Sequence, residues 1–179
     1  MKGQKYKRNN DLDSWKNDSV YTPDWLAEKI CNMYKINGDV LEPCKGEGVF
    51  MKYLPKNSDW CEIKQGKDFY QYKKNVDWIV TNPPYSHFDK FLEHCFLLSK
   101  NVVLLVPCSK FFTSIGKLRL VFNYGNFKEI HILAYSKAGF PFGFPSGVFF
   151  LEKGYKGKCE IKMLDGIEQA GGNVTQQRL

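Results

Sequence analysis

The unbroken apolar stretch Val-Val-Leu-Leu-Val at residues 102–106 most constrains the fold of this chain. Stretches of this kind are typical of parallel strands that are buried on both faces of a sheet. A second stretch, Trp-Ile-Val at 78–80, predicts another strand. Between the two, apolar residues recur at helical spacing: Phe88, Phe91, Leu92, Cys95 and Leu98. Strands that alternate with helices predict an open α/β sheet with helices on both faces, whose ligands bind outside the carboxyl ends of the strands.

The alternation continues towards both ends of the chain. Thr22-Pro23-Asp24 predicts the start of a helix, with threonine at the N-cap and proline in the first helical position, and Gly38 marks its end. Further strands are predicted at 39–42, 60–63 and 130–133, and further helices at 49–54 and 115–122. Two last strands, at 148–151 and 159–163, are expected to pair with each other in antiparallel fashion.

Length and composition indicate one globular domain. The 179 residues are 43% hydrophobic and 16% aromatic, which is enough to bury a sizeable core. We expect a flexible basic arm at 1–18, a single domain at 19–165 and a polar tail at 166–179. No apolar stretch approaches the roughly 20 residues that a membrane span needs, and the polar, basic N-terminus lacks the apolar segment of a secretory signal.

Cysteine usage and charge narrow the setting further. The six cysteines are scattered without a CxxC pair, which predicts a cytoplasmic protein with neither disulfides nor a bound metal. The net charge of +7 favours a polyanionic partner such as a nucleic acid. His87, His94 and His131 share no ligand spacing, so we assign them no metal and no catalytic role.

The strongest chemical signal is Asn82-Pro83-Pro84-Tyr85, directly after the predicted strand at 78–80. The motif offers an amide acceptor, rigid main-chain carbonyls and a flat aromatic face at the carboxyl end of a strand. These parts could hold a planar amino group while a donor attacks its nitrogen, which predicts transfer of a methyl group to an exocyclic or amide nitrogen. The alternative interpretation is a simple proline turn after a strand.

Three earlier segments could hold a nucleoside. Glu42 is followed by Pro43-Cys44-Lys45-Gly46-Glu47-Gly48, whose glycines permit close approach of the backbone to a ligand, although the segment could also be an ordinary turn. No lysine-serine pair follows, so this is not a Walker phosphate loop. Glu62 could bind ribose hydroxyls or simply be solvated. Asp68-Phe69 could contact an adenine, or Phe69 could belong to the core.

Taken together, these segments resemble the S-adenosylmethionine-dependent N6-adenine methyltransferases of DNA, in the order with the cofactor motif ahead of the catalytic motif. The resemblance assigns cofactor contacts to Tyr21, Thr22 and Pro23 (methionine part), to Glu42, Pro43, Cys44, Gly46 and Gly48 (main motif), to Glu62 (ribose), to Asp68 and Phe69 (adenine) and to Asn82. The catalytic motif matches at every position, which assigns catalysis to Asn82, Pro83, Pro84 and Tyr85.

The resemblance implies a Rossmann-like class I methyltransferase fold. Its sheet would be mostly parallel, with six or seven strands and an antiparallel strand near the C-terminal edge. The family usually has a helix and a strand between the ribose and adenine contacts, whereas Glu62 and Asp68 lie close together here, so that unit is expected to be missing. Nothing in the chain is long enough for a separate target-recognition domain, which leaves sequence specificity weak, confined to short loops or supplied by a partner.

The resemblance also implies how the substrate is held. The Asn82 side-chain oxygen and the Pro83 carbonyl would accept the two hydrogens of the adenine amino group, while Tyr85 stacks on the flipped base. Phe142 and Phe144, or their neighbour Phe140, could form the opposite wall of the base pocket. Basic side chains are candidates for phosphate contact: Lys110, Lys117 and Arg119.

Other substrates remain open within the same chemistry. The substrate could be RNA adenine, or it could be a protein glutamine, because Asn-Pro-Pro-Tyr also serves glutamine N5-methyltransferases. The basic charge and the Glu-Pro opening of the cofactor motif favour nucleic acid. A further alternative is a subunit that binds S-adenosylmethionine and is inactive without a partner.

Overall fold

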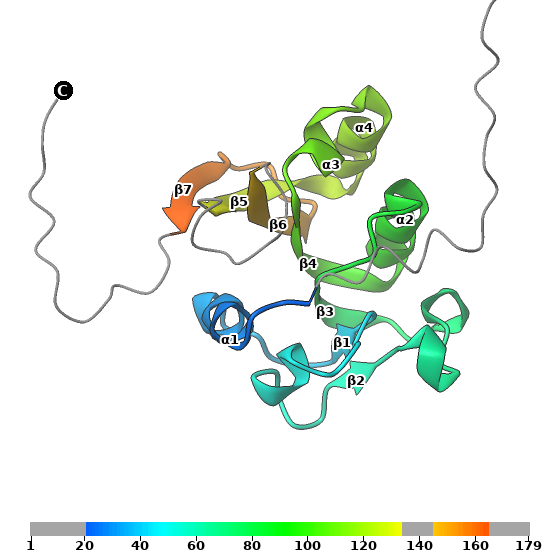
Figure 1. The fold of residues 1–179 in the computed structure, drawn as a ribbon. Coiled ribbons are helices and arrows are strands. Elements are labelled where there is room, and N and C mark those ends of the chain that lie inside the picture. Colours follow the sequence, from blue (N-terminus) through cyan, green and yellow to red (C-terminus); the bar gives the residue numbers. More distant parts are fainter. Residues whose placement is uncertain (1–20, 134–144, 165–179) are drawn as a thin grey trace, which may run out of the picture.

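The computed structural model describes residues 21–133 and 145–164. These residues contain seven strands: β1 (Val40–Glu42), β2 (Asp59–Trp60), β3 (Val76–Thr81), β4 (Ser99–Pro107), β5 (Gly125–Leu133), β6 (Ser146–Lys153) and β7 (Glu160–Leu164). The strands form one sheet in the order β2-β1-β3-β4-β6-β5-β7 (Figure 1). The predicted arm at 1–18 and tail at 166–179 lie outside the described residues.

The sheet is mostly parallel, as predicted. Neighbouring strands run parallel from β2 through β1 and β3 to β4, and β5 is parallel to β7. The exception is β6, which is antiparallel to both β4 and β5. The carboxyl ends of β1, β2, β3 and β4 therefore meet at one edge of the sheet, where α/β sheets bind their ligands.

The predicted antiparallel pairing of 148–151 with 159–163 is wrong. Both segments form strands, but β5 lies between them. β6 is buried from Ser146 to Leu151 and hydrogen-bonds along both of its edges, to β4 and to β5. β6 therefore has no free edge for β7, which instead joins the outer edge of β5 in parallel.

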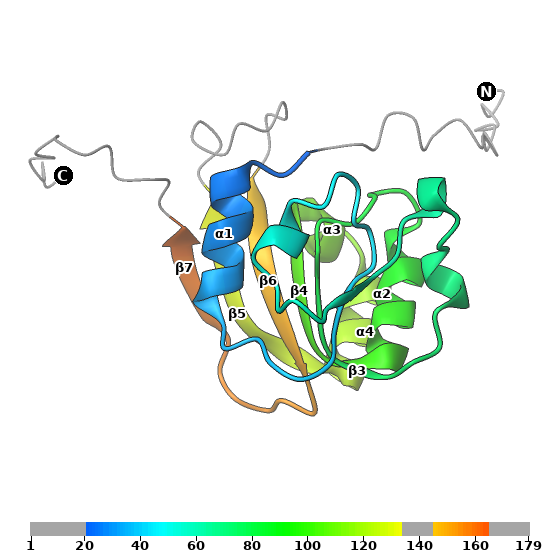
Figure 2. The same cartoon turned by 90° about the horizontal axis from the view of Figure 1, so that it is seen from below.

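Helices cover both faces of the sheet, and side chains along β4 point alternately to one face and to the other. Val102, Leu104 and Val106 pack into one cluster with α2 (Phe88–Leu98), α3 (Ser109–Phe112) and α4 (Ile115–Tyr124). Val103 and Leu105 pack into the other cluster with α1 (Asp24–Met33). Figure 2 shows α1 on one side of the sheet and α2 with α4 on the other. The longest helix of the described residues has 11 residues, so none of their helices could cross a membrane.

The helix predicted at 49–54 is wrong. Between Gly48 and Pro55 the chain forms only a short 3₁₀ helix, Phe50–Lys52. Fewer than two helical turns fit between these two residues, and the buried Phe50 and Leu54 fix the segment against the sheet instead.

The ends of α1 and β2 also differ from the predictions. Pro23 occupies the N-cap of α1 with no side-chain cap, so Thr22 is not the N-cap, and the helix ends at Met33 rather than at Gly38. β2 stops at Trp60, because Glu62 turns the chain by capping a 3₁₀ helix, Ile63–Gln65. Between Glu62 and Asp68 there is only this 3₁₀ helix and an isolated bridge. The helix and strand that the resembled family usually has between these contacts are therefore missing, as the sequence predicts.

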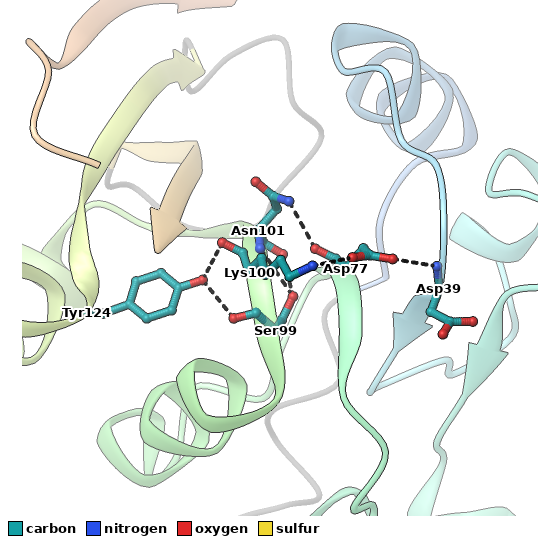
Figure 3. Close-up of polar contacts among 6 residues, drawn as sticks. All are labelled: Asp39, Asp77, Ser99, Lys100, Asn101 and Tyr124. Atoms are coloured by element: carbon teal, nitrogen blue, oxygen red, sulfur yellow. Dashed lines mark hydrogen bonds and ion pairs between the residues drawn. The ribbon is translucent and has the colours of Figure 1, made fainter. Parts of the chain in front are cut away.

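Polar contacts tie the sheet together at the amino ends of its strands. The Asp77 carboxylate accepts hydrogen bonds from the Asp39 main-chain nitrogen and the Lys100 ammonium, both at 3.1 Å. The Asn101 amide donates to the Asp77 carbonyl at 3.0 Å, and the Tyr124 hydroxyl donates to the Lys100 carbonyl at 2.7 Å (Figure 3). This network lies at the edge opposite to the carboxyl ends of β1, β3 and β4. One edge of the sheet is therefore held together by polar contacts, and the other is left for a ligand.

Candidate active site

A cavity of about 400 Å³ lies at the carboxyl ends of β1 and β3. Its walls come from five segments: the stretch that leads into α1 (Tyr21), the turn after β1 (Pro43, Cys44, Gly46, Glu47), the stretch after β2 (Glu62, Ile63, Lys64, Gln65, Asp68, Phe69, Tyr70), the segment after β3 (Asn82, Pro84) and α2 (Phe91). A cavity of this size with mixed aromatic and polar walls is typical of a small-molecule site.

The cavity brings together most of the residues that the sequence nominated as cofactor contacts. Those that line it are Tyr21, Pro43, Cys44, Gly46, Glu62, Asp68, Phe69 and Asn82. The nominated residues that do not line it are Thr22, Pro23, Glu42 and Gly48. Sequence reasoning missed other wall residues, namely Glu47, Ile63, Lys64, Gln65, Tyr70 and Phe91. Ile63, Lys64 and Gln65 could have been predicted from their position in the sequence, because they lie between the nominated acids Glu62 and Asp68.

The turn after β1 is shaped by its glycines and held by Glu62. Gly46 and Gly48 have φ angles of 52° and 85°, a region that residues with a side chain rarely adopt. The Gly46 main-chain nitrogen donates to Glu62 Oε2 at 2.8 Å. Nothing lies within 4 Å of the place where a Cβ atom of Gly46 would stand, so this side of the turn is open.

The buried Glu42 side chain stabilises the turn that follows β1. Its side chain is only 1% exposed, and its Oε1 accepts a hydrogen bond from the Cys44 main-chain nitrogen at 3.0 Å. Its Oε2 is buried as well, and the Thr81 side chain interacts with the carboxyl group. Burial raises the pKa of Glu42 to about 8, so the carboxyl group is largely protonated at neutral pH.

The two acids after β2 are oriented by the main chain. Glu62 Oε1 accepts from the Lys64 nitrogen at 3.0 Å, and Asp68 Oδ1 accepts from the Tyr70 nitrogen at 2.9 Å. A carboxylate has about four acceptor positions, so each acid can bind a ligand hydroxyl or amino group while it keeps these bonds.

Phe69 belongs to the core and also reaches the cavity. Its ring packs against Phe91 and His94, with centroid distances of 4.9 and 4.6 Å, and it is 6% exposed. It is therefore a core residue whose remaining surface forms part of the cavity wall.

Asn82 follows the last residue of β3 and points its amide between two hydroxyls. Its Nδ2 donates to Thr22 Oγ1 at 3.1 Å, and the Tyr85 hydroxyl donates to its Oδ1 at 3.4 Å. Pro83 is buried, whereas Pro84 lines the cavity. Lys110, from α3, donates to the Tyr85 carbonyl at 2.9 Å and lies 5.5 Å from the centre of its ring. The structure thus places Lys110 against the segment 82–85.

Other sequence candidates fall elsewhere. Phe140, Phe142 and Phe144 lie outside the described residues. His94 contacts the Phe69 carbonyl, and His131 contacts Glu129. All six cysteines are free thiols, and within 21–133 and 145–164 no group of three His, Cys, Asp or Glu side chains is placed to hold a metal ion.

Comparison with known proteins gives matches among solved structures. No protein-family model and no curated protein matches the chain. A putative class I S-adenosylmethionine-dependent methyltransferase from Listeria monocytogenes matches with a TM-score of 0.61 and 14% identity, over 83% of this chain and 68% of that one. A putative RNA methyltransferase from Pyrococcus horikoshii matches with a TM-score of 0.59 and 16% identity, over 81% of this chain and 91% of that one.

A larger protein also matches. The methyltransferase subunit of a type I restriction-modification system from Streptococcus thermophilus superimposes with a TM-score of 0.57 and 15% identity, over 76% of this chain. This chain spans only 45% of that subunit. At such low identities the likeness concerns the fold, and the conclusion is that this chain has the Rossmann-like fold of class I methyltransferases.

Proposed function

We propose that this protein is an S-adenosylmethionine-dependent methyltransferase that methylates the N6 amino group of adenine in DNA. The observation that carries the proposal is that Asn82 lines the same cavity as Gly46 and Glu62. These residues are far apart in the sequence, and the parallel strands β1, β2 and β3 bring them to one edge of the sheet. An amino-group acceptor and a nucleoside-binding turn in one cavity are what a methyl transfer to nitrogen needs.

The cavity suits S-adenosylmethionine. Glu62 would accept hydrogen bonds from the ribose hydroxyls, and Asp68 would accept one from the adenine amino group. Phe69 and Ile63 would contact the apolar face of the adenine. The open side of the Gly46 turn lets the backbone approach the ligand closely. S-adenosylmethionine would supply the methyl group in activated form, on a sulfonium.

The residues of the catalytic motif would compensate for a weak nucleophile. The lone pair of the adenine amino nitrogen is conjugated with the ring. When Asn82 Oδ1 and the Pro83 carbonyl accept the two amino hydrogens, the nitrogen moves towards tetrahedral geometry and its lone pair becomes available. Tyr85 would stack on the base and hold it in line. Such catalysis rests on alignment and electrostatics, so it requires no side chain of tuned pKa.

DNA is proposed as the substrate on two grounds. The chain carries a net charge of +7, which favours a polyanion. The Streptococcus thermophilus neighbour is the methyltransferase subunit of a type I restriction-modification system, which also supports a partner subunit as the source of sequence specificity. RNA adenine is the second candidate, because the chain covers 91% of the putative RNA methyltransferase.

Transfer of labelled methyl groups tests the proposal. Purified chain with labelled S-adenosylmethionine is offered single-stranded DNA, duplex DNA, RNA and protein, and the product is digested and identified. We expect N6-methyladenine in DNA, with single strands preferred because the base need not leave a duplex stack. Asn82→Ala should reduce transfer at least a hundredfold.

A matched control removes an asparagine that lies away from the cavity. Asn123, on α4, is exposed near the edge opposite to the site, so Asn123→Ala should keep full activity. Label in RNA alone, or in protein alone, would refute DNA as the substrate. Tight cofactor binding without transfer to any substrate would favour the partner-dependent subunit.

A further inference from the structure

The amide of Asn82 can serve as an acceptor only in one orientation. An asparagine side chain ends in an oxygen on one side and an NH2 group on the other. If the NH2 group faced the substrate, two donors would meet and the adenine amino group would not be bound. In this structure Nδ2 donates to Thr22 Oγ1 at 3.1 Å, and Oδ1 faces the Tyr85 hydroxyl at 3.4 Å.

The Thr22 hydroxyl is available for this contact because it does not cap α1. Pro23 occupies the N-cap of that helix, and no side chain caps it. A threonine just before a helix commonly binds the main-chain nitrogens of the first turn. Here the hydroxyl instead reaches a residue that lies 60 positions further along the chain.

The position of Thr22 is fixed by the helix that follows it. The Pro23 carbonyl accepts from the main-chain nitrogens of Leu26 and Ala27, at 3.0 and 3.1 Å. Leu26 and Ala27 are both fully buried against the sheet. Thr22 is thereby attached to a packed element rather than to a free loop, so it can hold Asn82 in one orientation.

We propose that Thr22 is a positioning residue, which turns the Asn82 amide so that its oxygen faces the substrate. This inference rests on the proposed function and deepens it. The hydrogen bond between Asn82 and Tyr85 is long, at 3.4 Å, so the substrate amino group can replace it without loss of a strong contact. The bond to Thr22 remains in place throughout the reaction.

The test replaces the hydroxyl and keeps the shape of the side chain. Thr22→Val should lower kcat about tenfold, the effect of one net hydrogen bond, while the Kd for S-adenosylmethionine by calorimetry stays within about twofold. Thr22→Ser, which restores the hydroxyl, should return kcat to near the wild-type value. Thr113→Val serves as the matched control, because the exposed Thr113, directly after α3, donates its hydroxyl to the Ser109 carbonyl of that helix.

A second background separates orientation from packing. In Asn82→Asp both side-chain oxygens are acceptors, so no orientation has to be chosen. We expect Thr22→Val to cost less than about threefold in kcat there, against about tenfold with asparagine. If Asn82→Asp has no activity, the effects of Thr22→Val on kcat and on the cofactor Kd decide whether Thr22 is a positioning residue.

One readout is independent of catalysis. The Asn82 side-chain NH2 signals in an NMR spectrum, identified by their loss in Asn82→Asp, should move on Thr22→Val and move little on Thr22→Ser. An unchanged kcat and unchanged NH2 signals in Thr22→Val would overturn the inference. A loss of cofactor affinity with kcat unchanged would also overturn it, and would make Thr22 a cofactor contact. If the wild-type chain transfers no methyl, the proposed function fails, while the NMR spectra still decide the role of Thr22.

Discussion

Burial in the fold strongly alters the ionisation of Glu42. The carboxyl group is buried beneath the turn that forms one wall of the cavity, and burial raises its pKa from the ordinary value of 4.5 to about 8. A raised pKa of an acid means that the folded state keeps a proton which the unfolded state has lost. The contribution of this group to stability is therefore complete below pH 4.5 and is lost as the pH rises towards about 8.

Replacement of Glu42 by glutamine should remove this pH dependence. Between about pH 5.5 and 7.5, the free energy of unfolding of the wild type should fall relative to that of Glu42→Gln by about 1.4 kcal/mol per pH unit. Urea unfolding at several pH values measures the difference. Glu28→Gln, at an exposed position on α1, should run parallel to the wild type. A constant difference between wild type and Glu42→Gln would show that Glu42 is ionised in the folded protein.

At the scale of elements, α1 links the stability of the molecule to the candidate site. Leu26 is fully buried and Leu97, on α2, is 72% exposed, which offers a matched pair of leucines in two helices. Leu26→Ala should lower the free energy of unfolding by about 3 kcal/mol, whereas Leu97→Ala should change it by less than about 0.5 kcal/mol. Urea unfolding measures both. Equal effects would mean that α1 does not pack as the structure has it.

Elements with a strong period could be predicted from the sequence. The spacing of Phe88, Leu92 and Cys95 predicts α2, and the apolar stretch at 102–106 predicts β4, because burial on one or both faces dictates those patterns. The pairing of β6 and β7 could not be predicted, because strand order depends on which distant edges are free. The helix expected at 49–54 fails for a similar reason, since packing of Phe50 and Leu54 outweighs local preference.

The candidate site was predicted in part for the same reasons. Glu62 and Asn82 each lie at a strand end or just beyond one, so topology brings them to one edge. The contact between Thr22 and Asn82 leaves no sequence signal, because threonine before proline and aspartate is better explained as a helix cap. The hydrogen bond between Lys110 and the Tyr85 carbonyl could not be predicted either, because a lysine in a basic chain suggests a phosphate contact.

On the scale of the whole molecule, charge and site geometry together predict how DNA is bound. The net charge of +7 implies that binding weakens linearly, on logarithmic scales, with rising salt. The target adenine has to reach the methyl donor in this cavity, and the exposed Lys64 lies on the cavity wall. We therefore expect Lys64 to contact a DNA phosphate, so Lys64→Gln should reduce the salt slope by about 1. Lys156, in the connection between β6 and β7, lies near the opposite edge, so Lys156→Gln should leave the slope unchanged. Titration of labelled DNA at several salt concentrations gives both slopes, and equal slopes would move the DNA path away from the cavity.

The most direct test of the central claim is the base composition of DNA from cells that lack adenine methylation of their own and express this chain. Mass spectrometry of the nucleosides should find N6-methyldeoxyadenosine with the wild type. With Asn82→Ala, which should keep the fold and bind S-adenosylmethionine, the modified nucleoside should fall to background. Equal amounts of the modified nucleoside with both chains would contradict the account, because Asn82 would then have no part in the transfer.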